Sequence, residues 1–360
     1  MRLFQNLGIS DRYTQRLKRL TRGLSSFDEL LTELLKDRYG ASHLLKPALD
    51  REASAFLTSG NDIPLQRAWA REHGLRASAT MEEVLLAQVE AHQPDVFYNL
   101  DPLRFDSTFV RKLPSCVKKS ICWRAAPSPG ANFGAYDLVV CNFPGIIESW
   151  RQRGLRSAYF APAHDPVMDE YADSSERAVD VVFVGTFSRH HSRRAQILEA
   201  VAGLASEYRV VMSLDRSRLT RLAESPVGLL PGLRSQRRPP AVRRVASEPT
   251  YGLDLYRLLS ASKIVLNGAI DMSGDDRGNM RCFESMGCGA LLVSDRGRYP
   301  DGMVDGRTML TYGSAQDVSH VLRSALSAWE HAAAIARAGL AMVRSEYSKN
   351  LQWQRFQDLV

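Results

Sequence analysis

Short apolar runs alternate with amphipathic stretches along the whole chain. In the first half, runs that predict strands occupy residues 2–5, 95–98, 120–123, 136–141 and 157–160. Amphipathic helices are predicted between them, at 27–38, where four leucines mark one face, and at 81–92, where Thr80 and Glu83 fit a capping box. Strands this short, with little internal alternation, are typical of a parallel sheet covered by helices on both faces.

The same alternation starts again near residue 179. Strands are predicted at 179–184, 209–213, 263–267, 290–294 and 309–312, and the helices among and after them include 253–261, 280–287, 315–329 and 330–347. Two successive βα arrays predict an α/β protein with two Rossmann-like, doubly wound domains that face a cleft.

The joint between the two arrays is expected at residues 161–166, which contain Pro162 and Pro166. We therefore predict an N-terminal Rossmann-like domain over 1–161 and a C-terminal Rossmann-like domain over 162–345. A last helix within 346–360 is expected to pack back on the N-terminal domain.

The composition fits two globular domains and favours anionic partners. The chain has 360 residues, of which 44% are hydrophobic and 24% charged, with a net charge of +7. It shows neither a long apolar run nor a secretory leader pattern, and its five cysteines form no C-x-x-C pair. We expect a cytoplasmic protein with no disulfide framework and no metal site.

Arginines are concentrated between Arg216 and Arg244, in a stretch that also contains several prolines. The pattern predicts a solvated, mobile loop that includes Arg234, Arg237 and Arg238. The stretch lacks the aromatic residues that would stack on bases, so we expect no specific nucleic-acid partner. A peripheral contact with the inner face of a membrane stays open.

The first candidate motif is a strand over 179–184 followed by Gly185 and Thr186 and then by a helix that carries Arg189, Arg193 and Arg194. A glycine lets a phosphate approach the backbone, and the first N–H groups of a helix point at the anion. A plain tight turn is the alternative. The motif lacks both G-x-G-x-x-G and a Walker lysine, which argues against hydride transfer and P-loop chemistry.

The second motif is more specific. A strand ending at Asn267 leads through a glycine- and acid-rich loop to Asn279, then to a short helix with Arg281 and Glu284, and then to Gly287-Cys288-Gly289. Arg281 and Glu284 are three residues apart and therefore share a helical face. An arginine can bind a diphosphate, and a carboxylate can accept both ribose hydroxyls. A salt bridge on a solvated helix is the alternative.

The stretch R-C-F-E-S-M-G-C-G-A-L-L-V, which starts at Arg281, resembles the donor-site helix of GT-B glycosyltransferases, particularly the spore-maturation-protein-like (CgeB-like) group of the glycosyltransferase 1 clan. The group's strand and helix motifs appear in order at 180–185, 262–267 and 281–289, and Y-F-A-P-A-H-D-P at 159–166 is similar to its interdomain segment. The resemblance implies that Glu284 holds the ribose, that Arg281, Gly185 and Thr186 hold the diphosphate, and that Arg189, Asn267 and Asn279 line the donor site.

Related retaining enzymes carry E-x7-E, whose first acid lies near the donor sugar. Asp276 occupies that position here, eight residues before Glu284, and the departure leaves the stereochemistry open, with retention slightly favoured. An inverting enzyme would need a general base, for which Asp11, Asp101 and His164 are the candidates. A cap or turn role is the more common one for an aspartate or histidine at each of these positions.

We expect a hexosyltransferase-like enzyme with no cofactor other than a nucleoside-diphosphate sugar as co-substrate. The acceptor would be a saccharide, a lipid-linked glycan or a protein, as in surface polysaccharide, glycolipid or glycoprotein synthesis. Two alternatives remain: a nucleotide-sugar epimerase of similar two-domain shape, and a non-catalytic basic binding protein.

Overall fold

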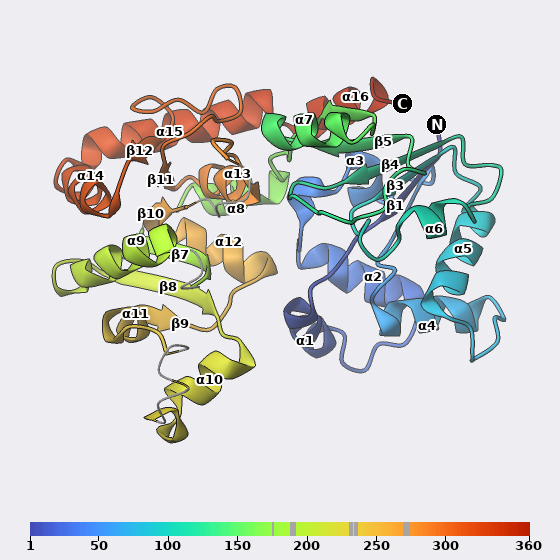
Figure 1. The fold of residues 1–360 in the computed structure, drawn as a ribbon, viewed down its shortest axis with the longest axis horizontal. Coiled ribbons are helices and arrows are strands. Elements are labelled where there is room, and N and C mark those ends of the chain that lie inside the picture. The colour runs from blue at the N-terminus through green and yellow to red at the C-terminus, as the bar shows by residue number, and fades with distance from the viewer. Residues whose placement is uncertain (175, 188–191, 230–232, 234–236, 269–273) are drawn as a thin grey trace. The chain divides into compact units, whose positions relative to one another are not determined.

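The chain forms two compact α/β units, each built on a six-stranded parallel sheet (Figure 1). The structure is a computed structural model that describes residues 1–174, 176–187, 192–229, 233, 237–268 and 274–360. The first unit comprises Met1–Ala163 and Lys349–Val360, and the second comprises His164–Ser348. The predicted fold class, two Rossmann-like parallel-sheet arrays, is confirmed.

The sheet of the first unit has the strand order β2-β1-β3-β4-β5-β6, and all its strands are parallel. The chain order reverses between β1 and β3, which makes that point the topological switch. The strands are β1 (Leu3–Asn6), β2 (Ala55–Thr58), β3 (Val96–Asn99), β4 (Lys119–Trp123), β5 (Leu138–Cys141) and β6 (Ser157–Tyr159). The strand β2 was not predicted, because it is a four-residue edge strand whose first two residues are only half-buried.

The helices of the first unit enclose an aromatic core. Phe4 and Phe97 of the sheet pack in one cluster with Trp150 of the flanking helix α7. Thr80 and Glu83 make both hydrogen bonds of the predicted capping box at the start of α5. The helices are α1 (Asp11–Leu20), α2 (Phe27–Lys36), α3 (Lys46–Leu49), α4 (Ile63–Glu72), α5 (Met81–His92), α6 (Ser107–Val110) and α7 (Pro144–Gln152), with the 3-10 turn η1 (Ala41–His43).

The C-terminal helix α16 (Lys349–Gln357) is part of the first unit. The buried Lys349 ammonium donates to the carbonyl oxygens of Ala41 at 2.6 Å and Leu44 at 2.7 Å. The Phe356 ring lies 4.9 Å from the ring of Tyr98. A buried cation satisfied by carbonyl oxygens, together with this aromatic contact, fixes α16 to the unit.

The sheet of the second unit has the order β12-β11-β10-β7-β8-β9, again all parallel. Its topological switch lies between β7 and β10. The strands are β7 (Val179–Thr186), β8 (Val210–Asp215), β9 (Ala246–Ser247), β10 (Ser262–Leu266), β11 (Leu291–Asp295) and β12 (Leu310–Tyr312).

Helices cover both faces of this sheet. Val181 and Phe183 of β7 pack with α9 and α14 on one face, whereas Val182 packs with Leu255 of α12 on the other. The helices are α8 (Asp169–Ala172), α9 (Ser192–Gly203), α10 (Arg218–Glu224), α11 (Pro240–Val245), α12 (Gly252–Ser260), α13 (Met280–Gly287), α14 (Ala315–Ser327) and α15 (Trp329–Glu346), with the 3-10 turns η2 (Pro166–Met168), η3 (Leu204–Ser206) and η4 (Pro226–Leu229).

The arginine-rich stretch corrects one prediction. In place of a solvated loop, its described residues include the helices α10 and α11 and the 3-10 turn η4. Arg238 is buried and makes a bidentate ion pair with Glu224, with Nε–Oε1 and Nη2–Oε2 distances of 2.6 and 2.7 Å. The prediction of a mobile Arg238 is therefore wrong, because a carboxylate fourteen residues away in the chain compensates its charge. Arg234 lies outside the described residues.

Candidate functional site

The carboxyl ends of β7 and β10 meet at the switch of the second sheet. In open α/β sheets, ligands bind at this edge. The strand β7 ends with Gly185 and Thr186, and Thr186 is exposed. A Cβ at Gly185 would lie 3.0 Å from the ring of Phe183, so a larger residue would force that ring to move. Arg189, predicted beside them, lies outside the described residues.

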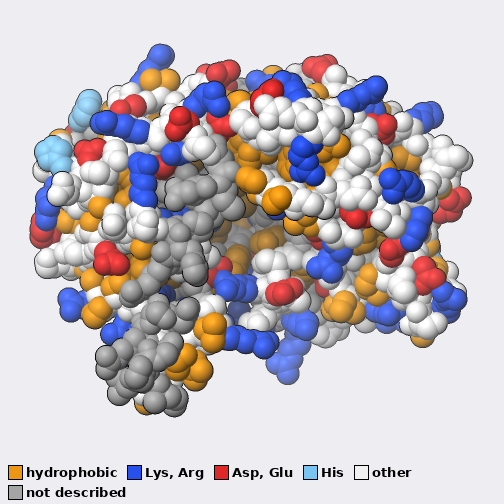
Figure 2. Space-filling view, viewed as in Figure 1, with side chains coloured by type: hydrophobic (Ala, Val, Ile, Leu, Met, Phe, Trp, Pro, Cys, Tyr) orange, Lys and Arg blue, Asp and Glu red, His pale blue; other side chains and the backbone are white. Residues whose placement is uncertain are grey.

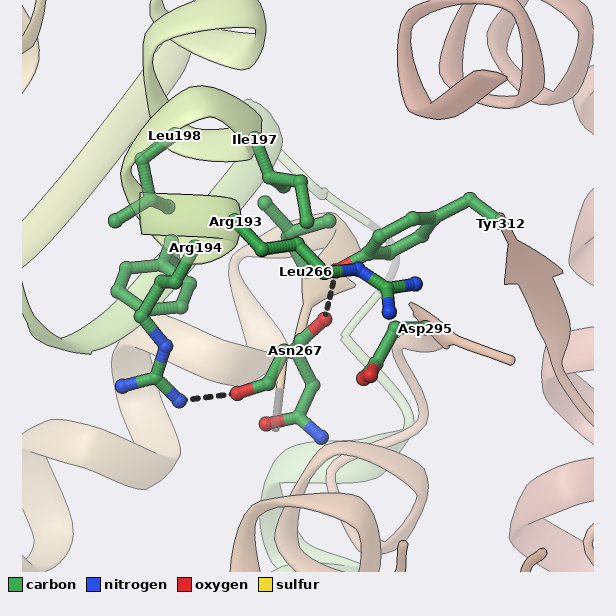
Figure 3. A pocket seen from close by; sticks show the side chains of 10 residues that line it. Arg193, Arg194, Ile197, Leu198, Leu266, Asn267, Asp295 and Tyr312 are labelled. Atoms are coloured by element: carbon green, nitrogen blue, oxygen red, sulfur yellow. Dashed lines mark hydrogen bonds between the residues drawn. The ribbon is translucent and has the colours of Figure 1, made fainter. Parts of the chain in front are cut away.

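Two arginines of α9 bring positive charge to this edge (Figure 3). They line a pocket together with Asn267, Asp295 and Tyr312 from the ends of β10, β11 and β12. The Arg194 guanidinium is buried, donates to the carbonyl oxygen of Gly268 and lies 5.9 Å from the Phe183 ring centroid. Arg193 donates to the carbonyl oxygen of Gly313 at 3.1 Å. Cations next to a βα turn are what a phosphate group requires.

Asn267 links the end of β10 to the start of α13. Its amide Nδ2 donates to Ser294 Oγ at 3.1 Å, and its Oδ1 accepts from Asn279 Nδ2 at 3.2 Å. Asn279 is the N-cap residue of α13. The structure thus brings these two predicted residues together and gives both a positioning role for the helix that carries Arg281. Their contact with a donor stays a prediction.

Arg281 and Glu284 form a buried ion pair on α13, with Nη1 and Oε2 2.5 Å apart. The Glu284 side chain is 4% exposed, so the alternative of a solvated surface pair does not describe this structure. Burial raises the pKa of the Glu284 carboxyl, and the Asp165 carboxylate adds to the rise, whereas Arg281 opposes it. The buried Nε of Arg281 has no hydrogen-bond partner within the described part of the chain. It is therefore a donor with capacity for a ligand.

His164 and Asp165 lie at the other end of α13. His164 Nε2 is 2.8 Å from Asp169 Oδ1, to which Arg344 Nε also donates at 2.7 Å. Burial lowers the pKa of His164, and its Nδ1 lies 2.8 Å from where a Cβ of Gly287 would be. A neutral imidazole packed against a helix end is a structural arrangement, and a general-base role for His164 stays a prediction.

Asp165 was not predicted from the sequence as a site residue. It is fully buried and accepts a hydrogen bond from the hydroxyl of Tyr256 at 3.1 Å. It also contributes to the raised pKa of Glu284. Its partners lie far along the chain, so only the fold reveals the cluster.

The Asp276 side chain is buried and is not exposed to solvent. Its carboxylate Oδ1 accepts from Arg298 Nε at 2.7 Å, and the two residues form a parallel backbone bridge. Next to this pair, Arg277 Nε donates to Asp295 Oδ2 at 2.7 Å. The two ion pairs hold the loop before α13 against the loop after β11. Asp276 thus has a structural role, and its contact with a sugar stays a prediction.

The remaining predicted acids belong to the first unit. Asp11 is the exposed first residue of α1. Asp101 follows β3, and its Oδ2 lies 3.2 Å from Arg104 Nε. A Cβ built at Gly8 would lie 2.8 Å from the Cβ of Asp101. Asp101 therefore lies beside the loop after β1, at the switch of the first sheet, where Asn6 Nδ2 donates to Asn99 Oδ1 at 2.8 Å. No base role is established for either acid.

Asp62, after β2, is a further acid that the sequence analysis missed. It is the N-cap residue of α4, but its side chain makes no cap hydrogen bond. Burial raises its pKa to about 6, and the Lys18 ammonium opposes the rise. A pKa near neutrality suits a general base. The sequence signal was ambiguous, because an aspartate before Ile63-Pro64 is what an ordinary N-cap looks like.

Residues 193–358 match a family model described as glycosyl transferase-like. No curated protein matches the chain. Among solved structures, HepE of Anabaena in complex with UDP and glucose is similar with a TM-score of 0.62 and 13% identity, covering 100% of this chain and 99% of HepE. A glycosyltransferase from Rickettsia africae has a TM-score of 0.60 and 10% identity, with 99% and 97% covered.

Sucrose-phosphate synthase from Thermosynechococcus elongatus is also similar, with a TM-score of 0.56 and 9% identity, covering 100% of this chain and 98% of the synthase. At these identities the likenesses show the fold, which is GT-B. The family match lies over most of the second unit.

No helix in the described part of the chain is both long and apolar enough to cross a bilayer. No group of three or more His, Cys, Asp or Glu residues in the same part of the chain could hold a metal ion.

Proposed function

We propose that the protein transfers a sugar from a nucleoside-diphosphate sugar to an acceptor hydroxyl, with no metal or other cofactor. The observation that carries this proposal is the arrangement at the switch of the second sheet. Arg194 and Arg281 offer positive charge there, and Glu284 offers a buried acceptor one helical turn from Arg281. A nucleoside diphosphate needs both: cations for its phosphates and an acceptor for its ribose hydroxyls.

The chemistry follows from the charge that develops when the anomeric C–O bond breaks. The leaving diphosphate gains negative charge, which preorganised guanidinium groups and helix N–H groups stabilise in a site with little water. Arg194 is fixed by Gly268 and Arg281 by Glu284, so neither has to reorganise as the bond breaks. This electrostatic assistance needs no divalent cation.

For the donor we propose a UDP-sugar as the first choice. Solved structures of the similar HepE contain UDP and UDP-glucose, and the pneumococcal O-GlcNAc transferase GtfA, at a TM-score of 0.50 and 9% identity, contains UDP and GlcNAc. The HepE fold matches this chain over its whole length, which supports UDP as the nucleotide to test before GDP, ADP or dTDP.

We also propose retention of the anomeric configuration, a CgeB-like relationship, and a glycan, glycolipid or protein acceptor at the inner face of a membrane. The spacing of Asp276 and Glu284 supports retention, and the motifs at 180–185 and 281–289 support the CgeB-like relationship. The net charge of +7 supports an anionic surface as a partner.

The test is a panel of nucleotides followed by donor turnover. UDP should raise the melting temperature, and a UDP-sugar should be slowly hydrolysed or transferred, with the anomer of the product identified by proton NMR. If no nucleotide raises the melting temperature and no nucleotide sugar is consumed, the proposed function is wrong. Consumption that yields an isomerised nucleotide sugar without free UDP would indicate an epimerase instead.

A further inference from the structure

The helix α10 exposes leucine and arginine side chains on the same face. Leu219 and Leu222 are 55% and 45% exposed, and Arg218 and Arg221 beside them are exposed as well. Arg218 and Arg221, and likewise Leu219 and Leu222, are three positions apart, and Arg218 and Leu222 are four apart, which places the residues together on the helix surface. In Figure 2, hydrophobic and basic side chains are exposed next to one another around α10.

The pair of leucines differs from the other exposed apolar residues. The remaining large hydrophobic side chains that are exposed in the described chain, such as Ile63 and Leu103, belong to separate elements or loops. Single exposed apolar residues are ordinary on protein surfaces, whereas two adjacent leucines on one helical face form a patch.

The charge on this face is uncompensated. Neither Arg218 nor Arg221 forms an ion pair with a described residue. The acid of α10, Glu224, is already bound by the buried Arg238. Among the described residues, the face therefore combines two cations with two leucines and has no unpaired carboxylate.

The helix is also well anchored, so the exposure is a property of the folded unit. Ser217 Oγ accepts from the backbone N–H of Thr220 at its start, and Ala223 is fully buried on its inner side. The Glu224–Arg238 ion pair fixes its end. A leucine pair held outward in this way would gain free energy by moving from water to an apolar partner.

We propose that α10 docks on a lipid bilayer that contains anionic headgroups. Arg218 and Arg221 would bind headgroup phosphates, while Leu219 and Leu222 would enter the boundary between headgroups and acyl chains. Leucines flanked by arginines are the combination that interfacial helices use, whereas a protein partner would not require two adjacent uncompensated cations. This inference deepens the peripheral membrane contact of the proposed function by naming the surface that makes it.

The test is co-sedimentation with vesicles of phosphatidylcholine and phosphatidylglycerol in equal parts, with pure phosphatidylcholine vesicles for comparison. The full chain should bind the mixed vesicles, and less so as salt is raised, because surface electrostatics are screened. The double variant Leu219→Ser with Leu222→Ser should lower the partition coefficient by at least about tenfold. Arg218→Gln with Arg221→Gln should lower it to a similar degree.

Val304→Ser with Arg307→Gln provides the matched control, because these exposed residues form an apolar–basic pair elsewhere in the same unit. It should bind vesicles as the wild type does. The thermal stabilisation by UDP should be the same in all variants as in the wild type. If UDP does not stabilise the wild type, the proposed donor is contradicted, and the vesicle result is still valid.

Three outcomes would overturn the proposal. The wild type could fail to bind mixed vesicles, the leucine variant could bind them as tightly as the wild type, or the control could lose as much as the leucine variant. Binding to duplex DNA that depends on the arginines but not on the leucines, without vesicle binding, would assign the surface to a polyanion instead.

Discussion

Asp276 and Arg298 join two loops at the edge of the second sheet. The Arg298 Nη2 lies 2.6 Å from Asp276 Oδ1, and the Asp276 side chain is completely buried while the Arg298 side chain is 61% exposed. Their backbones run together as well, since Arg277 N–H donates to the Arg298 carbonyl and Arg298 N–H donates to the Asp275 carbonyl, at 2.8 and 2.7 Å. A Cβ at Gly297 would lie 2.5 Å from the Asp275 carbonyl oxygen, so a glycine is needed for this approach.

We expect Asp276→Asn and Arg298→Gln to have similar consequences. Each removes the ion pair and loosens the loop before α13, so both should lower stability by about 1–3 kcal/mol and raise KM for the donor to a comparable degree. The measurements are melting curves and donor kinetics. If Asp276 contacts the sugar directly, Asp276→Asn will reduce kcat far more than Arg298→Gln does.

The two-domain α/β fold was predictable because both parallel sheets are buried on two faces and their strands therefore form continuous apolar runs. The strands β2 and β9 were missed for a physical reason. Ala55–Thr58 is a short edge strand, and Ala246–Ser247 has two residues, too few for any periodicity. Arg238 was misplaced because its charge suggested exposure, and the compensating Glu224 becomes its neighbour only in the folded chain.

The charge of Glu284 should govern nucleotide binding. Glu284→Gln keeps the size of the side chain and one acceptor oxygen but loses the charge. Since hydrogen bonds to charged groups contribute about 1.5–3 kcal/mol, we expect affinity for UDP to fall by roughly ten- to a hundredfold. Calorimetric titration should also show that 2′-deoxy-UDP binds the wild type more weakly than UDP does, but binds the variant about as well as UDP does. Equal affinities in all four titrations would remove Glu284 from the site.

Glu284 should also make the affinity for UDP depend on pH. Burial raises the pKa of Glu284. In the proposed site, the carboxylate is the form that would accept the ribose hydroxyls. Affinity for UDP should therefore fall as the pH is lowered towards this raised pKa, at a higher pH than an ordinary glutamate would give. In Glu284→Gln this acid limb should disappear; an identical limb in both proteins would assign it to another group.

Nucleotide binding should not need a divalent cation. In the proposed site, Arg194 and Arg281 would provide the charge that magnesium otherwise supplies. UDP at about 100 times its Kd should therefore stabilise the protein by about 2.7 kcal/mol. The shift in melting temperature should be the same in EDTA and in magnesium chloride. A shift that EDTA abolishes would mean that the phosphates are bound through a metal.

Breaking the Glu224–Arg238 pair should destabilise the second unit. Its two side chains are 9% and 5% exposed, and Arg238→Ser would leave a largely buried carboxylate, at a cost of about 3–5 kcal/mol. Arg244→Ser is the control, because Arg244 is exposed, and its effect should stay within about 0.5 kcal/mol. Chemical denaturation measures both, and equal effects would contradict the buried pair.

Contacts between distant segments limited what the sequence could predict about the site. Arg281 and Glu284 were predictable neighbours because a helix places residues three apart on one face. The Asp165–Tyr256 hydrogen bond joins residues 91 positions apart, and no local pattern encodes it. The same holds for Asp62, because its burial depends on how α1 and the loops after β1 and β2 pack, with Asn61 Oδ1 accepting from the Ile9 N–H at 3.0 Å.

Asp62 should make the protein less stable as the pH rises from about 4 to above 6. Its pKa is about 6 in the folded chain against an ordinary value of 3.8, so the unfolded chain ionises first. A raised pKa means that the stability contribution of this carboxyl is complete below the unfolded value and is lost as the pH rises through the folded value. About two pKa units correspond to about 3 kcal/mol. Asp62→Asn cannot ionise, so the variant should be more stable than the wild type by up to about that amount at pH 8 and about equal to it at pH 4.

The exposed Asp11 gives a control of opposite sign: Asp11→Asn removes a negative charge from the first turn of α1 and should cost less than about 1 kcal/mol. Urea denaturation at both pH values measures these differences, and an Asp62→Asn variant that is less stable than the wild type at pH 8 would show that the carboxylate has a stabilising partner.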